Sequence, residues 1–217
     1  MCGIFGITSA FDNIVPLLLK NLKYLAYRGY DSTGICLANS PFLIYKTVGG
    51  VDQLNPRAIT EHSLSGIGHT RWATHGKKSV ENAHPHTSGG VSIVHNGIIQ
   101  NHIELKSMLI HAGYQFKSET DSEVLAHLLH QQIQHNPPMI ALEKLKNKLK
   151  GRYAFIALIE SQPGMVFGLT SNLSLLIGYN EHSYSIASDL IALKHCTKYT
   201  KIPPHTPFYI SSTETSL

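Results

Sequence analysis

The 217-residue sequence has few charged residues and no long apolar run. Only 15% of the residues are Asp, Glu, Lys or Arg, and no basic stripe interleaved with aromatic residues occurs, so we expect no nucleic-acid partner. No apolar run approaches the roughly 18 residues that a membrane helix needs, and the first residues lack the basic region of a secretory signal. We therefore expect no membrane partner and a chain that starts near Met1.

Cysteine is also scarce. The three cysteines, Cys2, Cys36 and Cys196, are odd in number and far apart. This spacing fits neither a disulfide framework nor the paired ligands of a zinc site. A chain of this length buries about 70% of its unfolded surface, so it needs neither disulfides nor a metal to hold a core. We expect a reducing, cytoplasmic setting, with no cofactor and no bound metal.

Histidine, in contrast, is abundant, with 14 copies. Six of them lie in one stretch of the sequence: His69, His75, His84, His86, His95 and His102. Imidazole is a common zinc ligand, but the spacing matches no standard metal-binding motif. The histidine-rich stretch is therefore not interpreted as a metal site.

The expected elements come in the order strands, helices, strands. Short apolar runs bounded by turn-forming residues predict strands on both sides of a helical block. Within that block the pattern predicts helices over 101–112, from 120 toward 135, and over 138–149, and residues Thr120–Glu123 read as a capping box. Because the helices are grouped and do not alternate with the strands, we expect a layered α+β fold in one domain, 1–217.

Cys2 directly follows the initiator methionine, and its small side chain permits removal of Met1. The α-amine exposed by that removal has a pKa of about 7.7 to 8.0, so near neutral pH part of it is an unprotonated base beside the thiol. One residue would then supply both a nucleophile and a base. Taken alone, a cysteine at position two is more often a coincidence.

Other motifs place charges and donors at turns and strand ends. Arg28 and Asp31 lie three residues apart in a turn that contains glycines. Arg71 follows an expected strand, and its planar guanidinium suits a carboxylate. In the Asn96-Gly97 pair, the side-chain amide and the glycine N–H would point two donors at one oxygen, although Asn-Gly is also a common hairpin turn.

In order and spacing, these motifs resemble the N-terminal nucleophile (class II) glutamine amidotransferases. The resemblance covers nearly the whole chain and is carried by Met1 to Gly6, Arg28 to Gly34, His69 to Gly76, His95 to Gly97 and Ser118 to Asp121. Within that family, the sequence is similar to the glutaminase domain of glutamine:fructose-6-phosphate aminotransferases, the glucosamine-6-phosphate synthases. The resemblance implies a four-layer αββα sandwich of the N-terminal nucleophile hydrolase type.

The resemblance also implies a mechanism. The Cys2 thiolate would attack the side-chain carboxamide of L-glutamine, ammonia would leave, and water would hydrolyse the γ-glutamyl thioester to glutamate. Asn96 and Gly97 would form the oxyanion hole, with Gly97 also among the substrate-binding residues. Arg28 and Asp31 are expected to support the site.

For substrate binding, the family pattern assigns Arg71 to the α-carboxylate of glutamine and Asp121 to its α-ammonium. Thr74 and His75 match further pocket positions, and Trp72 matches a loop residue that closes over the site. A clamp at both ends of the substrate should reject asparagine, which is one methylene shorter.

The family pattern further implies a C-terminal sugar isomerase domain that binds fructose 6-phosphate, and this domain is not among the 217 residues. We expect the glutaminase half of a longer protein, with a stand-alone hydrolase as the alternative and a homodimer as a possible assembly. Another class II system, of the amidophosphoribosyltransferase or asparagine synthetase type, is less compatible with Tyr30 and Asp31. Segment 169–175 departs from the family pattern Ala-Arg-x-Gly-Ser-Pro-Leu, which motivates a further alternative, a catalytically silent glutamine-binding regulatory domain.

Overall fold

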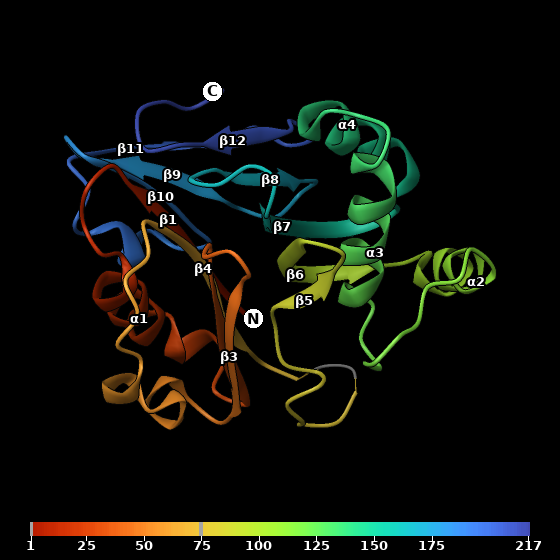
Figure 1. Ribbon diagram of the computed structural model, residues 1–217, viewed down its shortest axis with the longest axis horizontal. Coiled ribbons are helices and arrows are strands. Elements are labelled where there is room, and N and C mark those ends of the chain that lie inside the picture. Colours follow the sequence, from red (N-terminus) through yellow and green to blue (C-terminus); the bar gives the residue numbers. More distant parts are fainter. Residues whose placement is uncertain (1, 74–75) are drawn as a thin grey trace.

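The computed structural model of the protein describes residues 2–73 and 76–217, and its centre is a pair of antiparallel β-sheets packed face to face (Figure 1). The first sheet has the strand order β11 (Lys198–Lys201), β9 (Leu176–Tyr179), β10 (Ser183–Ala187), β1 (Gly3–Ser9), β4 (Ser65–Arg71), β2 (Ser32–Leu37), β3 (Leu43–Val48). The second has the order β12 (Phe208–Ile210), β8 (Val166–Thr170), β7 (Gly151–Ile159), β6 (Val91–Ile99), β5 (His86–Ser88).

Helices cover the outer faces of both sheets (Figure 1). Helix α1 (Val15–Tyr24) lies on the first sheet, and the second sheet is covered by α3 (Ser122–Ile133) and α4 (Pro138–Lys148), with α2 (His102–His111) flanking α3. Short 3-10 helices lie in the connections: η1 (Ala26–Arg28), η2 (Val51–Leu54), η3 (Pro56–Ala58) and η4 (Leu190–Leu193). The layer order is helix, sheet, sheet, helix, so the predicted four-layer α+β fold is confirmed.

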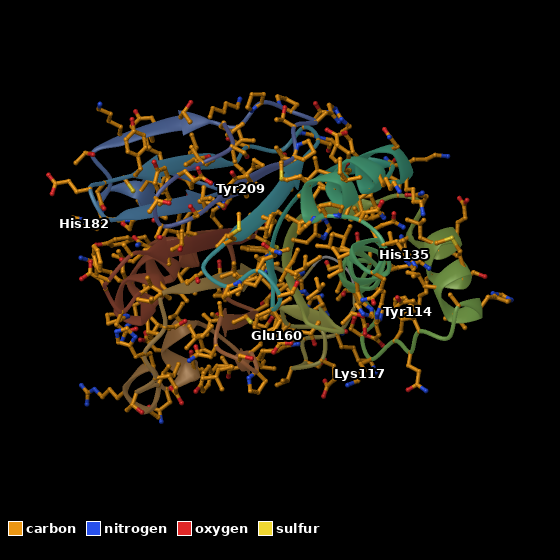
Figure 2. All side chains as sticks on the ribbon, turned by 45° about the horizontal axis from the view of Figure 1, so that its top comes forward. Tyr114, Lys117, His135, Glu160, His182 and Tyr209 are labelled. Atoms are coloured by element: carbon orange, nitrogen blue, oxygen red, sulfur yellow. The ribbon has the colours of Figure 1, made fainter. Side chains whose placement is uncertain are left out.

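Strand β1 shows how the sequence produces these layers. Successive side chains of a strand point to opposite faces, so Phe5 and Ile7 pack under α1 while Ile4 packs between the two sheets. There it meets Val94 of β6 and Ile156 of β7, and Figure 2 shows side chains filling the space between the layers. Because both faces of β1 are covered, all seven of its residues are buried.

The predicted capping box is wrong. Helix α3 begins at Ser122, and Asp121 is its N-cap residue without a side-chain capping bond. The carboxylate of Glu123 instead accepts hydrogen bonds from Lys117 N at 2.9 Å and from Ser118 N at 2.7 Å. The preceding loop folds back over the first turn of α3, and its N–H groups satisfy this carboxylate.

Among the described residues, no helix combines the length and the apolar character that crossing a membrane requires.

Candidate active site

Cys2 lies immediately before β1, which runs between β4 and β10 in the first sheet. The Cys2 Sγ accepts a hydrogen bond from the Trp72 N–H at 3.3 Å. Burial raises the pKa of the Cys2 thiol, and the lowering effects of the Trp72 N–H and of the charges on Arg71 and Arg28 offset only part of that rise. The thiol is therefore mostly protonated near neutral pH, and a base must deprotonate it before it can attack.

A small cavity of about 40 Å³ opens beside this thiol. Its lining residues come from both sheets and from the start of α3: Cys2, Arg71, Trp72, His84, His95, Gly97, Thr120, Asp121 and Ser122. A water molecule occupies about 30 Å³ in the liquid, so the enclosed part holds one end of an amino acid at most. Trp72, one of the lining residues, is 44% exposed.

The cavity brings together the predicted residues Cys2, Arg71, Trp72, Gly97 and Asp121. The predicted residues Thr74 and His75 lie outside the described part of the chain.

Asn96 lies beside the cavity and is held at both ends of its side-chain amide. Its Nδ2 donates to the main-chain oxygen of Cys2 at 2.9 Å, and its Oδ1 lies 3.0 Å from His69 Nε2. A primary amide carries two N–H donors, and the bond to Cys2 uses one of them. The other N–H is the group that an oxyanion hole requires.

Gly97 has a backbone conformation and surroundings that only glycine tolerates. Its φ angle is +110°, and a Cβ atom here would lie 2.1 Å from the carbonyl oxygen of Arg152 on β7. The main chain of β6 can therefore approach β7 and the cavity closely at this position. The side chain of Leu173, in the unusual 169–175 segment, also packs here, with its Cδ1 2.9 Å from that Cβ position.

Two opposite charges face the cavity from different elements. Arg71 ends β4 and is 4% exposed; burial lowers its pKa, whereas the acidic groups around it, Asp121 among them, raise it. Asp121 lies just before α3, and its Oδ2 accepts the Ile99 N–H at 2.7 Å. That hydrogen bond fixes the carboxylate between β6 and α3.

Arg28 fixes the residue that carries the thiol. Its Nε donates to the Cys2 carbonyl oxygen at 3.2 Å, and its Nη1 forms an ion pair with Asp189 at 2.6 Å. Tyr27 donates its hydroxyl to the same carboxylate. Arg28 is therefore held by Asp189, a residue far along the chain.

Asp31 fixes the segment that follows β4. Its Oδ2 accepts the Ala73 N–H at 2.9 Å, and its Oδ1 pairs with Lys78. Burial by itself raises the pKa of Asp31, but Lys78 and the Ala73 N–H outweigh burial, and the net shift is downward. The turn lies against this segment because Gly29 has no side chain: a Cβ there would meet the Arg71 carbonyl carbon at 2.5 Å.

Sequence reasoning missed the histidines that surround the cavity. His84 and His95 line it, and the His84 ring centroid lies 4.1 Å from that of His69 and 4.7 Å from that of His86. Burial lowers the pKa of His69 and of His86 to about 3, so both rings are neutral near pH 7. In the described part of the chain, no group of three or more His, Cys, Asp or Glu side chains is arranged to hold a metal ion. The only sign of these histidines in the sequence was the high number of them between residues 69 and 102.

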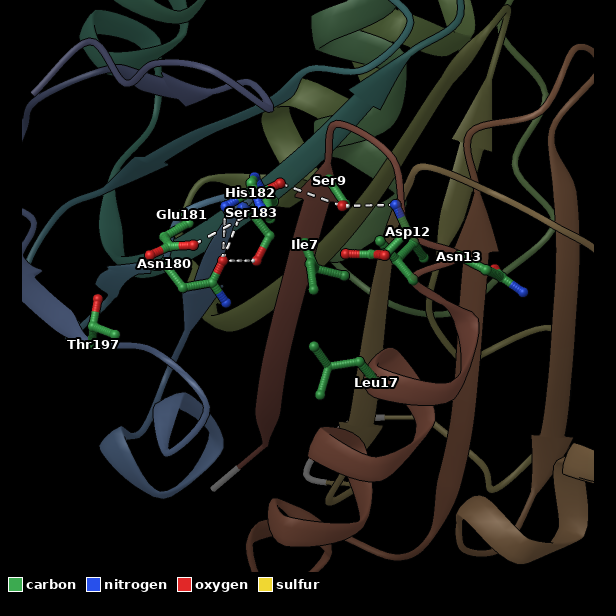
Figure 3. Close-up of a pocket in the computed structure, with 11 residues that line it drawn as sticks. Ile7, Ser9, Asp12, Asn13, Leu17, Asn180, Glu181, His182, Ser183 and Thr197 are labelled. Carbon is green, nitrogen blue, oxygen red and sulfur yellow. Dashed lines mark hydrogen bonds and ion pairs between the residues drawn. The ribbon is translucent and has the colours of Figure 1, made fainter.

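A larger cavity, of about 350 Å³, lies at the other end of β1 (Figure 3). Its polar groups hydrogen bond to one another: the Ser9 hydroxyl donates to the His182 carbonyl at 3.3 Å, and Asn180 Oδ1 accepts from Ser183 N at 3.0 Å. None of the sequence motifs contributes a residue to it. Four of the motifs contribute residues to the cavity at Cys2, which is therefore the candidate active site.

Comparison with known proteins shows the family of the chain. Residues 69–195 match the family described as glutamine amidotransferase domain. The chain belongs to this family. It is 41% identical over 207 residues to the glutamine–fructose-6-phosphate aminotransferase (isomerizing) of Methanosarcina mazei, covering 88% of this chain and 33% of that protein. It is 42% identical over 200 residues to the enzyme of the same name from Legionella pneumophila (strain Paris), covering 89% of this chain and 33% of that protein.

Among solved structures, the chain is similar to the glutamine phosphoribosylpyrophosphate amidotransferase of B. subtilis complexed with ADP and GMP. The TM-score is 0.85 at 25% identity, covering 99% of this chain and 48% of that one. The family match and the two curated relatives confirm the predicted resemblance to the glutaminase domain of glutamine:fructose-6-phosphate aminotransferases. The chain spans about a third of the length of the curated relatives it matches.

Proposed function

We propose that this glutamine amidotransferase domain hydrolyses L-glutamine to L-glutamate and ammonia, with Cys2 as the nucleophile. One observation carries this proposal: the Cys2 thiol shares a single cavity with the guanidinium of Arg71 and the carboxylate of Asp121. A free amino acid carries one carboxylate and one ammonium group, so this pair of opposite charges suits its α-carbon end. The Cys2 thiol would then face the side-chain carboxamide of glutamine.

The chemistry begins once Met1 has been removed. The α-amine of Cys2 takes the thiol proton, the sulfur forms a bond to the carboxamide carbon, and the C=O electron pair moves onto oxygen. The resulting ammonium group returns that proton to the leaving nitrogen, the C–N bond breaks, and ammonia departs. Water, deprotonated by the same amine, then attacks the γ-glutamyl thioester and releases glutamate and the thiol.

The tetrahedral intermediates carry a negative oxygen. The second Nδ2 hydrogen of Asn96 and the N–H of Gly97 are the donors that we assign to it, since Asn96 contacts the main-chain oxygen of Cys2 and Gly97 lines the cavity together with Cys2. Each such donor typically lowers the barrier by about 2.7 to 4 kcal/mol. Both donors are held before the substrate arrives, so little reorganisation is needed.

Recognition depends on a fixed distance between the charged end and the thiol. Arg71 would pair with the α-carboxylate and Asp121 with the α-ammonium, while the Ile99 N–H holds the carboxylate of Asp121 in place. Asparagine would leave either its charges unpaired or its carboxamide away from the sulfur. Trp72 lines the cavity and is exposed, and we expect its side chain to close over a bound glutamine.

For the whole protein, the proposal follows the curated relatives, whose name states that they are aminotransferases acting on fructose 6-phosphate. The ammonia would pass to a sugar isomerase domain C-terminal to this one and yield glucosamine 6-phosphate in the cytoplasm.

The direct test replaces the nucleophile. Cys2→Ala should abolish glutamate release from glutamine while leaving the melting temperature within a few degrees, because the side chain is small and partly exposed. Cys196→Ala is the matched control, since this thiol lies outside the cavity, and its turnover should equal that of the wild type. Turnover by Cys2→Ala at the wild-type rate would contradict the proposal, and so would glutamine binding without turnover in a wild-type sample proven to lack Met1.

A further inference from the structure

The polarity of the Asn96 side chain is fixed by its neighbours. The Cys2 carbonyl oxygen can only accept a hydrogen bond, so the amide atom that lies 2.9 Å from it must be the nitrogen. The other amide atom is then the oxygen, which also can only accept. His69 Nε2 lies 3.0 Å from that oxygen, so Nε2 must carry a hydrogen.

The position of His69 suits a hydrogen bond from its Nε2–H to the Oδ1 of Asn96. It lies on β4, opposite Ile4 of β1 and Gly34 of β2, and its side chain is 1% exposed. Burial holds its pKa near 3, so the ring is neutral and its proton stays on the nitrogen that the amide oxygen requires. The ring of His84 packs against it at 4.1 Å and restricts its rotation.

We propose that His69 is a positioning residue for catalysis: its Nε2–H holds the Oδ1 of Asn96, so that the amide nitrogen faces Cys2 and the developing oxyanion. Without this bond, only the Cys2 carbonyl would orient the amide of Asn96. Because the last torsion angle of the side chain is broad and roughly two-fold, turning the amide by about 180° would then cost less. A turned amide would present a carbonyl oxygen to the negative charge of the intermediate. His69 itself does not line the cavity and touches no substrate.

The inference rests on the proposed glutaminase function and is tested by three variants that differ in where they carry an N–H. In His69→Gln, the side-chain amide nitrogen reaches about as far as Nε2 does. In His69→Asn, it reaches only as far as Nδ1, and His69→Leu has no N–H. We expect His69→Asn and His69→Leu to lower kcat by roughly 10- to 100-fold with KM for glutamine changed by less than about threefold. His69→Gln should restore most of the kcat.

A double-mutant cycle with Asn96→Ala separates positioning from a structural role, because the amide that His69 orients is then absent. His69→Leu should lower the kcat of Asn96→Ala by less than about twofold. Thermal unfolding of each variant is measured beside the kinetics, and the kcat values are compared at a temperature where all variants are folded.

Equal losses of kcat in all three single variants, or a full loss in the Asn96→Ala background, would overturn the assignment and leave His69 as a core residue. Unchanged kcat in His69→Leu would overturn it as well. Failure of the underlying function is distinguishable, because the wild-type sample would then release no glutamate at all.

Discussion

Asn96 connects the parts of the site that lie farthest apart in the sequence. Its amide bridges Cys2, which immediately precedes β1, and His69 on β4 of the same first sheet, while Asn96 itself belongs to β6 of the second sheet. The position of the proposed oxyanion donor therefore depends on how the two sheets pack. The sequence indicated Asn96-Gly97 as a pair of donors, but it contained no sign of His69 as their partner. That pairing depends on tertiary packing.

At Gly97 both the backbone conformation and the surroundings exclude a side chain. Gly97→Ala should lower the free energy of unfolding by more than the 1–3 kcal/mol typical of a strained φ angle, because the added Cβ would also collide with the Arg152 carbonyl. Gly113 is the matched control, since its φ angle is +91° but no atom lies within 4 Å of a Cβ there. Urea unfolding should therefore show a clearly larger loss for Gly97→Ala than for Gly113→Ala, and equal losses would contradict the crowding at β7.

Among the elements, the strand ends and the start of α3 build the site. The sequence located the end of β4 well, because the polar residues that end an apolar run are visible locally, and Arg71 ends β4. The expected strand end at Asn96-Gly97 is wrong, because β6 continues through both residues to Ile99 and stays paired with β7. The start of α3 was misread at Glu123. Its partners Lys117 and Ser118 belong to a loop whose path no local pattern specified.

The loop that Glu123 holds predicts a dependence of stability on pH. Burial alone raises the pKa of Glu123, but the nearby His127 ring, whose Nε2 lies 3.6 Å from the carboxylate, and the hydrogen bonds from Lys117 and Ser118 outweigh burial and lower the pKa to about 2, from an ordinary value of 4.5. The stabilisation is therefore complete above about pH 4.5 and is lost as the pH falls toward 2.

Glu123→Gln removes this titration. Between pH 7 and pH 3.5, the wild type should lose about 1 kcal/mol more unfolding free energy than Glu123→Gln does. Urea unfolding at both pH values measures the difference, with Glu104→Gln on α2 as the control. Parallel pH profiles for the wild type and Glu123→Gln would show that the carboxylate is not stabilised as the hydrogen bonds indicate.

Over the whole molecule, the grouping of helices between two sets of strands predicted the layers, because each sheet must bury both faces. Local patterns could not predict which strands become neighbours. Strand β10 pairs with β1, although the two strands lie near opposite ends of the sequence. This pairing also brings Asp189, just after β10, close to Arg28. The family resemblance located most of the site, yet the contacts that hold it in place became visible only with the complete topology.

The position of Cys2, directly after Met1, makes removal of Met1 the central requirement of the proposed mechanism. The strand that begins at Gly3 is in the middle of the first sheet, and the residue before it, Cys2, lines the cavity. The proposed mechanism uses the main-chain nitrogen of Cys2 as well as its sulfur. A retained Met1 would convert that nitrogen into an amide, which is not a base at any ordinary pH. Every side chain of the site would then be present and the proposed deprotonation of Cys2 would still fail.

The most direct measurement uses a protein with a cleavable N-terminal extension that ends immediately before Cys2. Glutamate release from glutamine is followed before and after cleavage, with intact mass confirming the first residue, and a Cys2→Ala version serves as the control. We expect no turnover while the extension is present and turnover once Cys2 has a free α-amine. Equal glutamate release before and after cleavage would contradict the assignment of the α-amine as the base.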